Sequence, residues 1–120
     1  MKPIIAYILV FTLLATFLNS CGDGKFDYEK WSKVENTNYP PKARKNMIAD
    51  VLQNEIRKGM NTSDVLKLLG GPDYSNDSLI IYNIEIEYSS GVDPELTRDL
   101  VIHFKSDSIV TSFELREIKD

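Results

Sequence analysis

IRKGMNTSDVLKLLGGPD, the stretch at residues 56–73, predicts a tight corner between two helices. Gly59 can adopt the left-handed conformation that follows a helix C-cap, so we expect a first helix to end there. Asn61 is a strong N-cap residue, because its side-chain oxygen can accept an orphan backbone N–H of a second, short helix. Asp64 suits the positively polarised first turn, and Met60 and Val65 are spaced to pack as a hydrophobic staple. The corner determines local architecture and contains no recognisable catalytic or ligand-binding cluster.

The second helix has an equally clear end. Its apolar residues are expected to point inward; they are Val65, Leu66, Leu68 and Leu69. Gly70, Gly71 and Pro72 follow and stop the helix, since glycine is favoured just after a helix and proline cannot continue one. The next residues, 73–78, are polar and are interpreted as a loop, because they lack the alternating oxygen ligands of a calcium-binding loop.

Residues 42–58, before the corner, have helical periodicity. One side of this predicted helix is apolar and is expected to face the core; it comprises Met47, Ile48, Val51, Leu52 and Ile56. The opposite side is polar and carries Lys45, Asp50, Asn54 and Arg57.

Three strands are predicted after the corner, at residues 79–89, 98–105 and 109–118, and their short connections imply an antiparallel meander. In the first strand, Asn83, Glu85 and Glu87 alternate with apolar residues and are expected on the opposite face. Those apolar residues are Ile80, Tyr82, Ile84, Ile86 and Tyr88. The expected fold class is α+β, a two-layer ααβββ sandwich in which a helix–turn–helix packs on a three-stranded sheet.

The N-terminal residues have the pattern of a bacterial lipoprotein signal peptide. Lys2 is followed by an apolar run over residues 4–18, which is long enough for a signal peptide and short for a membrane span. Leu18, Asn19, Ser20 and Cys21 then resemble a lipobox, with Cys21 as the lipid-attachment residue. The resemblance implies cleavage before Cys21 and fatty acyl chains on it. Two or three such chains together make a lasting anchor, whereas a single chain holds a protein only marginally. A secreted protein with a spare thiol and a simple membrane span are the alternatives.

This interpretation divides the chain into residues 1–20 as signal peptide, 21–42 as lipidated tether and aromatic segment, and 43–120 as the folded domain. Of the 14 Lys and Arg residues, Lys2 is lost with the signal peptide, which leaves 13 against 18 Asp and Glu. Such an acidic chain argues against nucleic acid as a partner and against a polybasic grip on lipid. We therefore expect membrane attachment through the lipid on Cys21. Lipidation of the only cysteine also leaves no thiol for a disulfide or a metal site.

The segment FDYEKW, residues 26–31, is too aromatic for a pure linker. Phe26 and Trp31 are interpreted in three ways: docking on the domain, contact with the membrane interface, or contact with a partner. Docking is the commonest fate of such residues, because buried aromatic area dominates small cores.

The corner and the strands together resemble the BamE (SmpA/OmlA) lipoprotein family. The similarity covers residues 47–115 and rests on the corner and on strand positions at Tyr82, residues 101–104 and Val110. Asn61 stands where the family usually has threonine. Residues 26–31 and 44–47 are more similar to small lipoproteins that share this domain than to BamE itself. The resemblance implies an ααβββ domain, also found doubled in β-lactamase inhibitor proteins, and a location in the bacterial envelope.

No enzyme motif is recognisable, and we expect no cofactor, metal or small-molecule substrate. The only histidine, His103, is predicted mid-strand on the exposed sheet face, where a surface pair with a carboxylate is the ordinary explanation. The same face is expected to be a possible partner surface together with Phe26 and Trp31. Its residues are Glu85, Glu87, His103, Lys105, Glu114 and Arg116.

Two classes of function fit these patterns. The first is a non-catalytic, lipid-anchored interaction or scaffold protein of the cell envelope with an unidentified protein partner. The second is an inhibitor or immunity-type protein that binds an enzyme through its open sheet face. Gly22 after Cys21 lacks an aspartate retention signal, which favours the outer membrane over the plasma membrane in a cell that has both.

Overall fold

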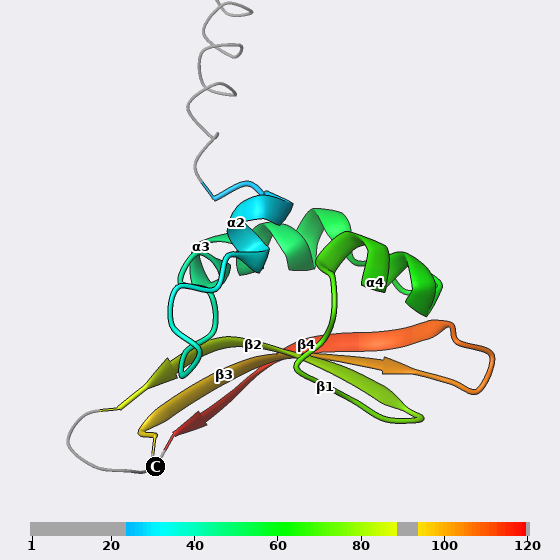
Figure 1. The fold of residues 1–120 in the computed structure, drawn as a ribbon. Coiled ribbons are helices and arrows are strands. Elements are labelled where there is room, and N and C mark those ends of the chain that lie inside the picture. The colour runs from blue at the N-terminus through cyan, green and yellow to red at the C-terminus, as the bar shows by residue number, and fades with distance from the viewer. Residues whose placement is uncertain (1–23, 89–93, 120) are drawn as a thin grey trace, which may run out of the picture.

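The computed structural model describes residues 24–88 and 94–119. Helices lie on one face of an antiparallel sheet, so the fold is α+β (Figure 1). The helical elements are α2 (Tyr28–Ser32), α3 (Arg44–Asp50), the π-helical turn η1 (Val51–Glu55) and α4 (Thr62–Leu69). The strands are β1 (Tyr74–Ser75), β2 (Leu79–Glu87), β3 (Leu96–Phe104) and β4 (Val110–Lys119).

The first predicted helix is shorter than expected and ends differently. It begins at Arg44 and changes to a π-helical turn at Val51, where the N–H of Ile56 donates to the O of Val51 at 3.0 Å. Ile56 itself is extended. The π turn adds about one residue to this turn of the helix. Val51 and Ile56, at its two ends, are both buried in the core.

The corner that follows has the predicted caps of α4, but Gly59 does not end the first helix. Gly59 has a φ of +88°, but it lies in a turn after the helix, in which Met60 N–H donates to Arg57 O at 3.2 Å. Asn61 caps α4, since its side chain accepts the N–H of Ser63 at 2.9 Å. Gly70, with a φ of +81°, ends α4 as predicted.

Within α4, Val65 and Leu69 are buried and Leu68 is half-buried. Leu66 was expected inward but is 42% exposed, so that prediction is wrong. Asp64 is exposed in the first turn, and Met60 packs against the buried cluster that contains Val65.

The sheet has four strands in the order β1-β2-β3-β4, all antiparallel, where three were predicted. β1 occupies part of the predicted loop at residues 73–78; it is only two residues long, too short to show an alternating pattern. Two irregularities interrupt the register, one at Asn83/Glu85 in β2 and one next to His103/Phe104 opposite β4.

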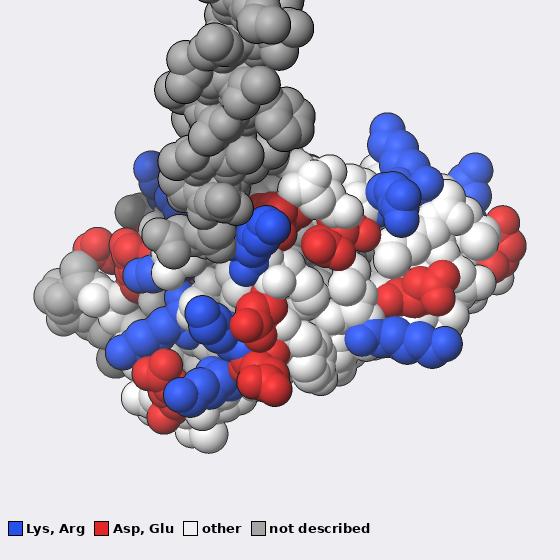
Figure 2. Space-filling model, turned by 90° about the horizontal axis from the view of Figure 1, so that it is seen from above, with Lys and Arg blue, Asp and Glu red and all other residues white. Residues whose placement is uncertain are grey.

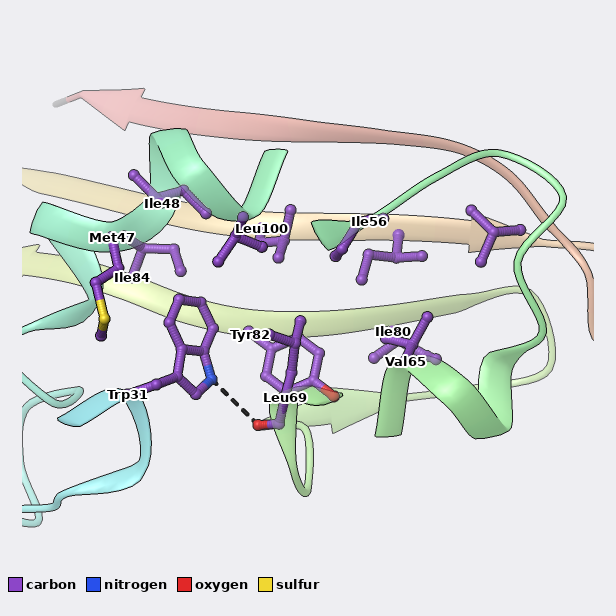
Figure 3. Packing of buried hydrophobic residues seen from close by; sticks show 13 residues of the cluster. Trp31, Met47, Ile48, Ile56, Val65, Leu69, Ile80, Tyr82, Ile84 and Leu100 are labelled. Carbon is purple, nitrogen blue, oxygen red and sulfur yellow. Dashed lines mark hydrogen bonds between the residues drawn. The ribbon is translucent and has the colours of Figure 1, made fainter. Parts of the chain in front are cut away.

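The core lies between the helices and the sheet (Figure 3). Trp31 from α2 is fully buried there, and its indole Nε1–H donates to Leu69 O at 3.1 Å. The ring contacts Phe26 and Tyr82 edge-on, with centroids 5.8 Å and 6.2 Å away. The packed part of the chain therefore includes α2, which lies in the segment predicted to precede the domain.

Candidate functional site

The sheet face away from the helices is the first candidate. We call it the open face, because no described helix covers it. Its members are the β-strand residues that alternate with the core positions Tyr82, Leu100 and Ile102, and they include Asn83, Asp99, Val101, His103, Glu114 and Arg116. Paired residues on neighbouring antiparallel strands lie side by side on one face.

Two charged contacts cross the open face between β3 and β4. Arg116 contacts the carboxylate of Asp99 at 3.2 Å, and His103 Nε2 lies 3.6 Å from Glu114 Oε1. Asp99 is only 6% exposed, and its Oδ1 has no hydrogen-bond partner among the described residues. A buried carboxylate next to a half-exposed arginine makes this the most charged part of the face. The predicted members His103, Glu114 and Arg116 are therefore brought together.

Glu85 and Glu87 are not on the open face, contrary to the prediction. The register shift after Asn83 places Glu85 opposite Arg98, and Glu87 opposite Leu96. Arg98 is two residues from the core residue Leu100, so this pair lies on the helix side of the sheet. A bulge inserts one residue and reverses the alternation beyond it, which the sequence pattern does not reveal. Ile86 and Tyr88, expected in the core, are accordingly half-buried and exposed.

On the helix side, Glu85 belongs to a separate group of ion pairs. Arg98 contacts Glu85 at 3.2 Å and Glu117 at 3.8 Å, and Lys119 contacts Glu117 at 3.4 Å. These side chains are partly exposed, so each pair contributes little to stability. Figure 2 shows basic and acidic groups interspersed on this side of the molecule. Lys105, also predicted on the partner surface, lies exposed in the turn after β3, where its N–H donates to Ile109 O.

The aromatic segment docks on the domain. Trp31 is 0% exposed and Phe26 packs against the core cluster, so Trp31 does not form part of a partner surface. The N–H of Phe26 donates to the carboxylate of Asp50 at 2.7 Å, which ties the segment to α3. Of the aromatic residues here, Tyr28 remains 48% exposed.

Arg44 joins four parts of the fold and was missed by the sequence analysis. Its Nε donates to Trp31 O at 2.9 Å, and one terminal nitrogen contacts Asp73 at 3.0 Å and Asn83 O at 2.9 Å. The guanidinium also lies 4.9 Å from the centre of the Trp31 ring, within cation–π range. Its spacing could have predicted its burial, because residue 44 lies on the same side of the helix as the apolar residues Met47, Ile48 and Val51.

Within residues 24–88 and 94–119, two groups have clearly shifted pKa values, and each has a structural hydrogen-bond partner. The backbone N–H of Phe26 and then the side chain of Asn54 hold the pKa of Asp50 below its ordinary 3.8, with a further contribution from Lys25. Burial raises the pKa of Tyr82 well above its ordinary value. The Tyr82 hydroxyl donates to Gly70 O at 2.7 Å, so it has a structural partner at the end of α4.

The surface has a hollow of about 600 Å³ at the end of the sandwich near the start of α4. Hydroxyl and amide side chains line it together with apolar ones; they are Thr62, Leu66, Pro72, Ser75, Asn76, Asp77, Ile80, Phe104, Ser106 and Ser108. A smaller hollow of about 190 Å³ lies between residues 39–45 and β2.

The lipobox residues Leu18, Asn19, Ser20 and Cys21 lie outside the described residues. Among the residues that the structure does describe, no helix has the length and apolar character to cross a bilayer. Within the same ranges, 24–88 and 94–119, no three His, Cys, Asp or Glu residues are grouped to bind a metal ion. Comparisons with protein-family models, curated proteins and solved structures found no match.

Proposed function

We propose that this chain is a lipid-anchored lipoprotein of the bacterial cell envelope that acts as a non-catalytic protein-interaction module. The observation that carries the proposal is the sequence Leu18-Asn19-Ser20-Cys21 directly after the apolar run at residues 4–18. The docking of Phe26 supports it, because only residues 22–25 then separate the lipidated cysteine from the packed chain. Four residues span at most ~14 Å, so the domain would stay close to the membrane surface.

The open face is the proposed contact surface. It presents the partly exposed charged side chains of His103, Glu114 and Arg116, which a partner's charged or hydrogen-bonding groups could contact. We assign no reaction to the chain in this proposal. We further propose that α3 to β4 correspond to a BamE-like ααβββ domain, with α2 and β1 as additions to it.

Membrane fractionation of cells that express the full chain tests the anchor. The parent protein should sediment with the membranes, and Cys21→Ser should move to the soluble fraction with an unchanged fold. Asn19→Ala is the matched control, because it alters the lipobox without removing the acceptor sulfur. Mass spectrometry of the processed parent that shows an unmodified thiol at Cys21 would refute the proposal.

The alternative, an inhibitor or immunity-type protein, uses the same face toward a different partner. Capture with the parent protein and with Glu114→Lys separates the two. Envelope components that are lost with Glu114→Lys support the scaffold role, whereas a single soluble enzyme lost with the same variant supports inhibition. Lys42→Glu, outside the open face, is the control that should retain the partner in both cases.

A further inference from the structure

Among the described residues, the corner covers the outer side of β4 at the start of the strand. Val110 exchanges two backbone hydrogen bonds with the corner: its N–H donates to Met60 O, and its O accepts the N–H of Gly59, both at 2.8 Å. Beyond this point, at residues 111–119, no described segment pairs with the outer side of β4. An edge strand of this length presents a row of backbone groups that another strand can bind.

The backbone groups that face outward can be identified from the register. Phe104 N–H donates to Ser78 O just before β2, and the direction of backbone groups alternates along a strand. The N–H and C=O of His103 therefore point toward β4, where its partner is Ser112. It follows that, beyond the irregularity near residue 111, the odd-numbered residues of β4 direct their backbone groups outward; these are Phe113, Leu115, Glu117 and Lys119.

We propose that a second copy of this chain pairs with β4 in antiparallel orientation, with Leu115 on the two-fold axis. Two identical strands related by a two-fold axis pair residue for residue about the midpoint of their contact. The uncovered segment 111–119 has its midpoint at Leu115, so this register uses its full length. It also places outward-directed residues opposite outward-directed residues, which the hydrogen bonds require.

Charge selects the same register. With Leu115 on the axis, Glu114 lies opposite Arg116 of the second copy, and Arg116 lies opposite Glu114 of the second copy. These are non-hydrogen-bonded pairs, in which Cα atoms approach to ~4.5 Å and side chains are closest. Sliding one strand by two residues places Glu114 against Glu114 or Arg116 against Arg116, which is unfavourable. Glu114 and Arg116 therefore disfavour the registers shifted by two residues and favour the register centred on Leu115.

The contacts within one chain extend the pattern. Arg116 already contacts Asp99 at 3.2 Å, and Glu114 lies 3.6 Å from His103. Across the interface, the order becomes Asp99, Arg116, then Glu114 and His103 of the second copy. On the helix side, Leu115 is 38% exposed and would be covered by its symmetry mate.

Cysteine cross-linking of the full chain tests the register. The parent background carries Cys21→Ser, so an introduced cysteine is the only thiol. Leu115→Cys should form a disulfide-linked dimer under mild oxidation, because Cα atoms of a hydrogen-bonded antiparallel pair lie ~5.5 Å apart, within disulfide range. Glu117→Cys is the matched control: its symmetry mate lies four residues along the strand, ~13 Å away, and it should not cross-link. Cross-linking of Glu117→Cys without Leu115→Cys would overturn the register.

Charge exchange tests the partner. In sedimentation equilibrium, Glu114→Arg and Arg116→Glu should each weaken self-association about tenfold, because each creates like-charge pairs across the axis. An equal mixture of the two variants should restore association, since every cross-axis pair is then of opposite sign. Circular dichroism checks that each variant folds. If Arg116→Glu is unfolded by its proximity to Asp99, the cysteine pair decides the question.

A chain that is monomeric in the Cys21→Ser background and forms no Leu115→Cys cross-link overturns the proposal. So does a mixture of folded charge variants that stays as weakly associated as each variant alone. The inference does not depend on the lipid anchor, because the cross-linking samples and the charge variants all carry Cys21→Ser. Failure of dimerisation and failure of membrane attachment are therefore distinguished.

Discussion

Arg44 satisfies polar groups on three separate segments of the fold. It is 6% exposed and donates to Trp31 O, to the Asp73 carboxylate and to Asn83 O. A buried guanidinium is tolerated only when its hydrogen bonds are made, and here backbone oxygens supply two of them. The planar geometry of arginine matches this divergent set of acceptors, which the single nitrogen of lysine cannot serve.

We predict that Arg44→Ala lowers the free energy of unfolding by ~2–3 kcal/mol. The loss of a buried ion pair costs more, but Asp73 is 39% exposed on its side chain and can recover water. Urea unfolding followed by Trp31 fluorescence measures the effect, because the chain has one tryptophan. Lys45→Ala, an exposed neighbour on the same helix, should change stability by less than ~0.5 kcal/mol. Equal stabilities for the two variants would contradict the assigned role of Arg44.

Gly59 gives a second prediction at this scale. Its φ of +88° is strained for any residue with a Cβ, although a Cβ there would meet no atom within 4 Å. We expect Gly59→Val to lower the thermal midpoint by the equivalent of more than ~1 kcal/mol, through backbone strain alone. Gly71→Val is the control, since Gly71 also has open space around it and no positive φ. A midpoint that moves equally in both variants would show that side-chain size, and not φ, matters.

At the scale of elements, a titratable side chain of α3, Asp50, binds the segment just before α2. Asp50 accepts the N–H of Phe26, and this bond lowers the pKa of Asp50 in the folded state. A carboxyl whose folded pKa is depressed contributes stability above its unfolded pKa, and the contribution is lost as pH falls through the folded value.

We therefore predict that Asp50→Asn is less stable than the parent at neutral pH, that the difference begins to shrink near pH 3.8, the ordinary pKa of this carboxyl, and that it is lost once the pH is below the lowered folded pKa. Denaturant midpoints across this pH range measure it. Asp77→Asn, which removes an exposed carboxylate from the β1–β2 loop, serves as the control. A deficit of Asp50→Asn that persists unchanged in acid would mean that the hydrogen bond to Phe26 is not what the carboxylate contributes.

The sequence predicted those elements whose signals are local. The Asn61 cap, the stop at Gly70 and the core residues of β2 up to Ile84 follow from capping chemistry and alternation, and all are confirmed. The π turn at residues 51–55 was not predictable, because its i+5 bond leaves the apolar spacing nearly helical. β1 was missed because a two-residue strand is defined by its partner and not by its own pattern.

The candidate site was predicted in part, and the errors have one physical cause. His103, Glu114 and Arg116 share a face because β3 and β4 alternate regularly over that region. Glu85 and Glu87 do not, because the bulge at Asn83/Glu85 depends on pairing with β3. Long-range pairing cannot be read from one strand, and the role of Arg44 was missed for the same reason.

For the whole molecule, the boundary of the folded domain depends on Trp31. Its side chain fills the core between α3, α4 and β2, although it lies before residue 43. We predict that a fragment of residues 43–120 shows no cooperative thermal transition, because deleting a buried tryptophan costs ~3–5 kcal/mol in a small core. A fragment that begins at residue 24 should melt cooperatively. Identical melting of the two fragments, measured by circular dichroism, would place Trp31 outside the cooperative unit.

The two borders of the sheet differ in length, and this difference limits how far copies can assemble. β1 offers only Tyr74 and Ser75, whereas β4 is ten residues long. A contact that uses β4 of both molecules leaves the β1–β2 border on each outer flank. There β1 pairs with Ile80 and Ile81, and Arg44 and Asp73 occupy the backbone O and N–H of Asn83. Growth by strand addition would then stop at a pair, and the protein would be protected from fibre formation by geometry.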